Sequence, residues 1–223
     1  MEPREFKQLV FQEFARIAAA FANSKRLEII DILAQAERDV DTLSRRVGLS
    51  VASTSQHLQV LKQAKLVKIR REGVKIYYRL ADEQVAQCWL NLQHLAESRS
   101  SEIREAVSLF YRERDSYEPL SAQEVWQKIE KDEVILIDVR PREEYLAAHL
   151  PGAISVPLPE LENFIREAPA GKEIVAYCRG KYCVLSAEAV KRMTDANLKA
   201  IRLSDGLPDW KFNYLPIEVK EEK

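Results

Sequence analysis

The feature that most constrains this fold is a loop bounded by two cysteines, Cys178-Arg179-Gly180-Lys181-Tyr182-Cys183. The apolar run Ile174–Tyr177 precedes the loop and predicts a buried strand, and the residues that follow Cys183 predict a helix. Free backbone N–H groups and the helix dipole stabilise anions at a helix N-terminus, so they favour the thiolate form of a cysteine placed there. The pattern therefore predicts thiol chemistry at the end of a strand.

Short apolar runs alternate with helical segments through the C-terminal half of the chain. Val134–Asp138, Ile174–Tyr177 and Ala200–Leu203 predict strands, and a helix is expected near Arg142–Ala148. Strands that are apolar throughout and separated by helices are typical of a mostly parallel sheet covered on both faces. Ser121 and the glutamate three residues later form a capping box that opens this half.

The N-terminal half has a different pattern, in which amphipathic helices precede a β-hairpin. Alternating apolar and polar residues on both sides of Gly73 predict the hairpin. Two short helices joined at Gly48 and followed by a basic hairpin indicate a winged helix-turn-helix. The expected helices cover residues 4–21, a segment capped by Asn23 or Ser24, a segment that ends at Gly48, residues 50–63 and one long helix from Asp82 to about Tyr111, and the hairpin covers residues 66–80.

Basic charge is concentrated in the winged part of the chain. The whole chain has a formal net charge of −1, but residues 42–81 contain nine basic residues and one acidic residue, a net charge of +8. A local basic window in a neutral chain indicates contact with a polyanion on one surface. The residues expected to contact DNA are Ser53, Thr54, Ser55, Gln56 and Gln59 on the second short helix, and Arg70, Arg71 and Lys75 on the wing.

The segments Ser50–Val67 and Arg71–Leu80 resemble the ArsR/SmtB family of dimeric repressors, and the resemblance covers about residues 5–110. It implies a homodimer, formed through the first and last helices of this domain, on palindromic double-stranded operator DNA. The Cys-x-Cys metal motif of the family is absent from residues 36–42, and His94 with Glu97 supplies too few ligands for a closed site. We therefore expect no metal, and we interpret Cys88 as a packed thiol.

The C-terminal half contains four motifs, which are Ile137–Tyr145, His149–Ile154, Tyr177–Gly180 and Asp205–Trp210. They occur in the order typical of a rhodanese domain, to which residues 120–217 are similar. The resemblance implies that Cys178 is a nucleophile that accepts sulfane sulfur. Cys183 occupies the sixth loop position, where it is either a packed side chain or a resolving thiol. The anion cradle is expected to consist of Arg179, Gly180, Lys181, Tyr182 and Arg140.

Together these patterns predict two domains, a mainly α winged helix-turn-helix domain and an α/β rhodanese-like domain with a mostly parallel sheet. The expected bounds are residues 1–111, a charged linker at 112–120 and residues 121–223. No apolar run is long enough to span a bilayer, and the N-terminus lacks the apolar core of a signal peptide, so we expect no membrane contact and a cytoplasmic protein. Three cysteines in a reducing compartment favour redox or catalytic use over a disulfide framework.

Three functions remain open from the sequence. The first is a homodimeric DNA-binding regulator, a repressor by family, that senses reactive sulfur or oxidants through Cys178. The second is a sulfurtransferase that moves sulfane sulfur through a Cys178 persulfide. The third is a repressor that responds to an arsenic oxyanion. All three imply a small sulfur species or an oxyanion as the ligand, and none needs a bound cofactor.

Overall fold

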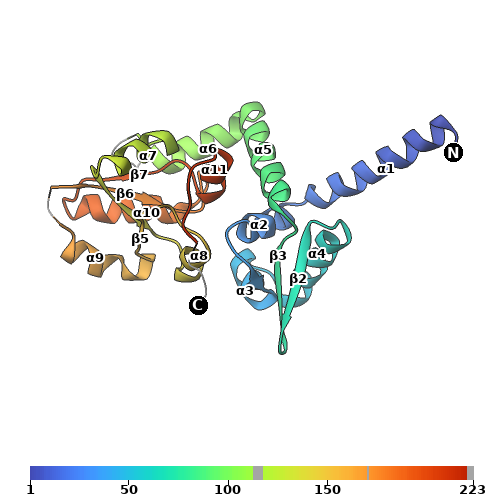
Figure 1. The fold of residues 1–223 in the computed structure, drawn as a ribbon, viewed down its shortest axis with the longest axis horizontal. Coiled ribbons are helices and arrows are strands. Elements are labelled where there is room, and N and C mark those ends of the chain that lie inside the picture. Colours follow the sequence, from blue (N-terminus) through green and yellow to red (C-terminus); the bar gives the residue numbers. More distant parts are fainter. Residues whose placement is uncertain (113–117, 170, 220–223) are drawn as a thin grey trace. The chain divides into compact units, whose positions relative to one another are not determined.

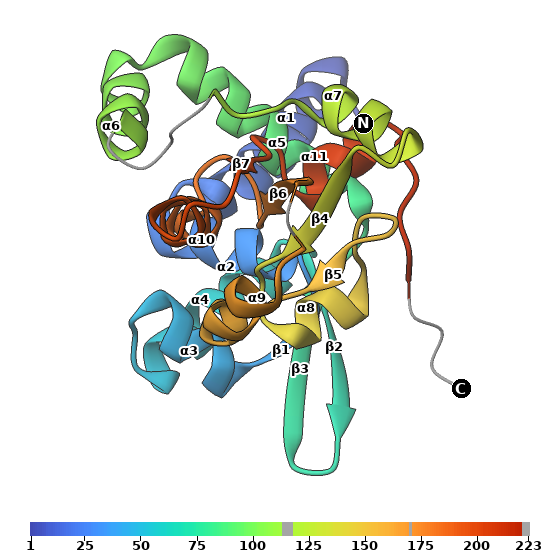
Figure 2. The ribbon, with the colours of Figure 1, turned by 90° about the vertical axis from the view of Figure 1, so that its left-hand side faces the viewer.

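The computed structural model describes residues 1–112, 118–169 and 171–219, and the chain divides into two compact units, Met1–Trp89 and Leu90–Lys223 (Figures 1 and 2). The division falls inside a helix, so the second unit includes the end of that helix as well as the α/β fold. Residues 113–117 of the predicted linker lie outside the described residues.

The first unit has the helices and the hairpin expected of a winged helix-turn-helix domain. Side chains cap its helices as the sequence indicates: Asn23 accepts a hydrogen bond from the Arg26 N–H, and Ser50 accepts one from the Ser53 N–H. Gly48 ends its helix with φ +65°, a left-handed conformation that favours glycine. The elements are α1 (Pro3–Phe21), α2 (Ser24–Leu33), β1 (Arg38–Asp39), α3 (Val40–Val47), α4 (Val51–Gln63), β2 (Val67–Glu72), β3 (Lys75–Leu80) and the start of α5 (Glu83–Arg99).

The three strands of this unit form an antiparallel sheet in the order β1-β3-β2, and β2 and β3 form the wing. The wing extends well beyond α3 and α4, and α1 projects away from the other helices of the unit (Figure 1). A core formed by α2, α3 and α4 holds the two short helices together. Its fully buried apolar residues are Ile29, Ile30, Leu43, Leu58 and Leu61.

The prediction of one long helix from Asp82 to Tyr111 is wrong, because the helical segment breaks at Ser100. The segment forms α5 and a second helix, α6 (Ser101–Arg112). The Ser100 hydroxyl accepts a hydrogen bond from the Ile103 N–H at 3.2 Å, which caps the new helix. The apolar stripe continues across the break, so hydrophobic periodicity alone did not reveal it.

The second unit contains a four-stranded sheet in the order β5-β4-β6-β7, and every strand pair in it is parallel. The sequence patterns did not predict short β5, the turn at Leu158–Glu160, α9 and α11. The elements are α7 (Ala122–Glu130), β4 (Val134–Asp138), α8 (Arg142–Ala147), β5 (Ile154–Ser155), α9 (Leu161–Glu167), β6 (Glu173–Tyr177), α10 (Val184–Asp195), β7 (Ala200–Arg202) and α11 (Leu207–Phe212).

Apolar side chains cover both faces of this sheet. One cluster joins residues of α7 and α11 to the strands, and it includes the fully buried Trp210. The other cluster joins α9 and α10 to the opposite face, and it includes Cys178. Because parallel strands end at the same edge, the register places Asp138, the last residue of β4, beside Tyr177, the last residue of β6. The thiol loop, defined as residues 178–183, therefore begins at the carboxyl edge of the sheet.

Candidate functional site

The thiol loop connects β6 to the first turn of α10, as predicted. Cys178 is 1% exposed, whereas Cys183 is partly buried and is the residue directly before α10. The two residues form a disulfide with a Cα–Cα distance of 6.2 Å, which lies within the usual range for such bonds. The loop thus brings its two thiols together, and one of them is shielded from solvent.

Close packing against a neighbouring loop fixes the shape of the thiol loop. The Cys183 N–H donates to the Gly180 carbonyl at 3.0 Å, and Gly180 has φ +140°. Gly206 lies so near that a Cβ on it would stand 2.0 Å from the Arg179 carbonyl oxygen. The Asp209 side chain accepts a hydrogen bond from the Gly206 N–H and holds this second loop in place. In the sequence, Gly206 and Asp209 belong to the last of the four motifs, and a glycine just before a short helix is the signal that indicates such a close approach.

The cationic side chains of the thiol loop are engaged by carboxylates, which differs from the expected anion cradle. Arg179 donates two hydrogen bonds, at 2.9 and 2.8 Å, to Glu144, whose side chain is fully buried. Lys181 forms an ion pair with Glu97. Burial, followed by the negative charge of Glu97, raises the pKa of Tyr182 to about 12. These pairs place both expected cations of the loop beside protein carboxylates.

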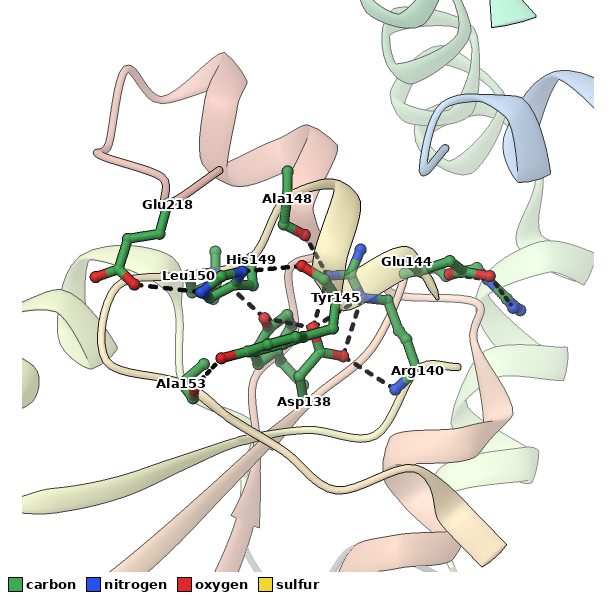
Figure 3. A network of polar contacts seen from close by, with 11 residues as sticks. Asp138, Arg140, Glu144, Tyr145, Ala148, His149, Leu150, Ala153 and Glu218 are labelled. Carbon is green, nitrogen blue, oxygen red and sulfur yellow. Dashed lines mark hydrogen bonds and ion pairs between the residues drawn. The ribbon is translucent and has the colours of Figure 1, made fainter. Parts of the chain in front are cut away.

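Arg140 has a structural position, so its expected role as an anion ligand is not supported. Its side chain and that of Asp138 are both 0% exposed, and the two form an ion pair at 2.6 Å (Figure 3). Arg140 also donates to the Ala148 carbonyl at 2.8 Å. The Tyr177 hydroxyl donates to Asp138 at 2.6 Å and accepts from the Leu150 N–H at 3.1 Å. This network braces the strand ends beneath the thiol loop.

Most of the residues expected to contact DNA on α4 lie on its accessible side. Ser55, Gln56 and Gln59 are exposed, and Ser53 is partly exposed. The structure does not support the expected DNA contact of Thr54, because this residue is 0% exposed and its hydroxyl donates to the Ser50 carbonyl at 2.9 Å. Thr54 therefore stabilises the start of α4 from inside the domain.

On the wing, Arg71 and Lys75 are exposed near the β2–β3 turn. Arg70 is exposed too, but its guanidinium pairs with Glu37 at 2.6 Å and with Glu72 at 2.7 Å. The pair with Glu37 holds the wing to the segment before β1, and the pair with Glu72 lies within β2. Arg71 and Lys75 are therefore better placed than Arg70 to contact a phosphate.

Other candidate ligands are dispersed over the described residues. Cys88 is a free thiol and is exposed in this chain, so its interpretation as a packed side chain is wrong. In the described part of the chain, no group of three or more His, Cys, Asp or Glu side chains is arranged to hold a metal ion. Among the same residues, no helix has the length and hydrophobicity needed to cross a bilayer.

Comparison with known proteins assigns a family to each half of the chain. Residues 23–68 match the arsR family of bacterial regulatory proteins, and residues 121–213 match the rhodanese-like domain. The chain is 38% identical over 212 residues to the HTH-type transcriptional regulator Rv0324 of Mycobacterium tuberculosis. The aligned region covers 95% of this chain and 93% of that protein. One regulator is therefore similar to this chain over nearly its whole length.

Two further matches each cover less than half of the chain. The putative sulfur carrier protein YrkF of Bacillus subtilis is 33% identical over 93 residues, which is 41% of this chain and 49% of that protein. A solved structure, the homodimeric winged helix-turn-helix DNA-binding domain of Mb0332 from Mycobacterium bovis, is 37% identical with a TM-score of 0.42. The aligned region covers 46% of this chain and 93% of that fragment.

Proposed function

The chain belongs to the ArsR family of HTH-type transcriptional regulators and carries a rhodanese-like domain, and from this premise we propose that it is a homodimeric repressor that senses reactive sulfur or oxidants through Cys178. The observation that carries the proposal is the Cys178–Cys183 disulfide in the thiol loop. A thiol with a partner within bonding reach can store a chemical signal as a reversible covalent bond. The DNA-binding half of the same chain can then report that signal.

The chemistry balances with a persulfide as the oxidant. The Cys178 thiolate attacks the outer sulfur of a persulfide RSSH, forms a Cys178 persulfide and releases RSH. The Cys183 thiolate then attacks Cys178 Sγ, so that the disulfide forms and hydrosulfide leaves. The two thiols lose two electrons, and the sulfane sulfur gains them. With a peroxide, Cys178 becomes a sulfenic acid and Cys183 displaces water from it.

The start of α10 supports this role for Cys178. Backbone N–H groups in the first turn of a helix have no partner within the helix, and they favour a nearby anion. The Cys183 side chain, at the N-cap position of α10, makes no capping hydrogen bond to the first turn. The Cys178 persulfide would be stabilised by those donors, without a side-chain cation from the loop.

The first unit supplies the proposed output. The exposed side chains of α4 and of the wing suit base edges and phosphates. Phe6, Phe14 and Ile17 are exposed along α1, and large apolar side chains at helical spacing favour burial against another helix. A second copy of the chain would cover them and would place two copies of α4 on the two halves of a palindrome.

Affinity for DNA in defined thiol states tests the proposal. The duplex is selected from a random-sequence library with the fully reduced protein, and its affinity is measured before and after treatment with polysulfide. Coupling of the usual size would change the affinity about 5- to 150-fold. Cys178→Ser should abolish the change, and Cys183→Ser should accumulate a Cys178 persulfide visible by mass spectrometry. Cys88→Ser is the control and should respond as the wild type does.

An unchanged affinity in the treated wild type would contradict the proposal. The similarity to a putative sulfur carrier favours the second function, in which the C-terminal domain turns over as a sulfurtransferase. Multiple turnovers with thiosulfate and a thiol acceptor, lost in Cys178→Ala, would support that function. Loading of one sulfur atom per chain, followed by disulfide formation, would support the sensor.

A further inference from the structure

Two helices that precede the rhodanese-like fold contact the thiol loop directly. Both contacts lie within the second unit, Leu90–Lys223. Glu97, near the end of α5, contacts the side chains of Lys181 and Tyr182. Tyr111, near the end of α6, contacts the backbone of the same half of the loop. The helices therefore hold residues 181–183, which contain the cysteine proposed as the resolving thiol.

Tyr111 is built into the structure as a fixed support. Its side chain is buried, with 8% exposure. Its hydroxyl lies 2.7 Å from the Lys181 carbonyl oxygen and 3.4 Å from the Cys183 carbonyl oxygen. The guanidinium of Arg202, on β7, stacks 3.9 Å from the centre of its ring. Because the ring is held from behind, the hydroxyl can bind these two carbonyls only while the loop keeps its present shape.

Glu97 adds a second contact that depends on the loop conformation. Its carboxylate pairs with the Lys181 ammonium and accepts a hydrogen bond from the Tyr182 hydroxyl at 3.4 Å. Its backbone carbonyl accepts a hydrogen bond from Arg104, on α6, at 2.6 Å. The residue thus connects the loop, the end of α5 and the first turns of α6. We define Tyr111 and Glu97 together as the helix clamp.

We propose that the helix clamp positions Cys183 beside Cys178, so that formation of the disulfide is coupled to the docking of α5 and α6 on the loop. The meaning of this coupling as a signal rests on the proposed function, whereas the coupling itself does not. If the contacts of Tyr111 and Glu97 with the loop are stronger in the disulfide state, they favour the disulfide. By reciprocity, formation of the disulfide then strengthens those contacts by the same free energy. Tyr111 and Glu97 are positioning residues, since neither takes part in the exchange of sulfur.

The thiol–disulfide equilibrium with glutathione tests the clamp. Reduction consumes two glutathione molecules, which deliver two electrons and two protons to the cysteines and leave as glutathione disulfide. In a Cys88→Ser background, the reduced fraction is read by alkylation and mass spectrometry. The net stabilisation by one hydrogen bond predicts that Tyr111→Phe makes the disulfide about two- to tenfold easier to reduce. Glu97→Gln should shift the equilibrium in the same direction.

Matched controls remove the same groups elsewhere in the unit. Tyr214→Phe deletes a hydroxyl from a side chain that is 94% exposed, and Glu105→Gln neutralises an exposed carboxylate on α6. Both should keep the wild-type equilibrium. If Tyr111→Phe and Glu97→Gln also keep it, the clamp is refuted. A merely structural role would lower the stability of the fold without moving this equilibrium.

Hydrogen exchange on the full-length protein supplies an independent readout. In the wild type, residues 90–112 should exchange more slowly in the disulfide form than in the reduced form, and Tyr111→Phe should reduce that difference. An equal difference in the variant would overturn the clamp. If the clamp variants shift the glutathione equilibrium but DNA affinity ignores the thiol state, the clamp stands and the proposed function fails. If the clamp variants keep the wild-type glutathione equilibrium but DNA affinity follows the thiol state, the clamp fails and the proposed function stands.

Discussion

Replacing Arg140 by leucine tests whether this residue braces the fold or binds an anion. The substitution leaves the Asp138 carboxylate with 0% exposure and without its cation. Removing one partner of a buried ion pair costs about 3–5 kcal/mol. In a domain of about 100 residues, each 1 kcal/mol lowers the unfolding temperature by roughly 4–8 °C. The midpoint for the rhodanese-like unit should therefore fall by more than about 10 °C.

Calorimetry on the full chain measures this effect, because the two units can unfold in separate transitions. Arg142→Leu is the matched control, since its side chain is 63% exposed and its ion pair with Glu160 lies at the surface; its midpoint should stay near that of the wild type. Adding Asp138→Asn to Arg140→Leu should recover part of the loss, because no buried charge remains unpaired. A wild-type midpoint for Arg140→Leu, combined with loss of Cys178 loading by thiosulfate, would refute this reasoning.

Three smaller substitutions separate contacts that stabilise the fold from contacts that serve DNA or the loop. Lys75→Ala should lower affinity on all duplexes alike and reduce the slope of log affinity against log salt by about 1. Thr54→Ala should destabilise the first unit by about 1 kcal/mol through loss of the bond to Ser50, which urea unfolding measures. The pKa of Tyr182 is raised from 10.0 to about 12, so stability should fall from pH 10 to pH 12 as the unfolded chain alone loses this proton. Tyr182→Phe should flatten that fall, and an unchanged stability curve would show that burial and the charge of Glu97 do not act on this hydroxyl.

The strands and the thiol loop were predictable because their signals are local. The run Val134–Asp138 has the same bounds as β4, since apolar residues in the core of a parallel sheet are continuous in sequence. The position of Cys178–Cys183 between β6 and α10 follows from the same kind of pattern. Local capping by Ser50 and Ser121 was visible for the same reason, because each cap binds an N–H three residues away.

The partners of the charged residues were not predictable, because they come from distant parts of the chain. Glu144 is 35 residues from Arg179, and Glu97 is 84 residues from Lys181. A single sequence supplies the charges but not which of them meet, so the sequence alone predicts Arg179 and Lys181 as ligands for an anion. The prediction of a continuous helix across Ser100 failed for another reason. The Ser100 cap interrupts the helix, although the apolar period runs through this position.

The central claim is that the state of the Cys178–Cys183 pair sets the affinity of the first unit for DNA. One titration tests it most directly: a selected duplex is titrated at fixed salt with the homogeneous disulfide form and with the fully reduced form of the same protein. The claim predicts that the two dissociation constants differ by about fivefold or more. Cys178→Ser, which cannot form the disulfide, should bind with the same dissociation constant before and after treatment with polysulfide. Equal dissociation constants for the two forms of the wild type would contradict it.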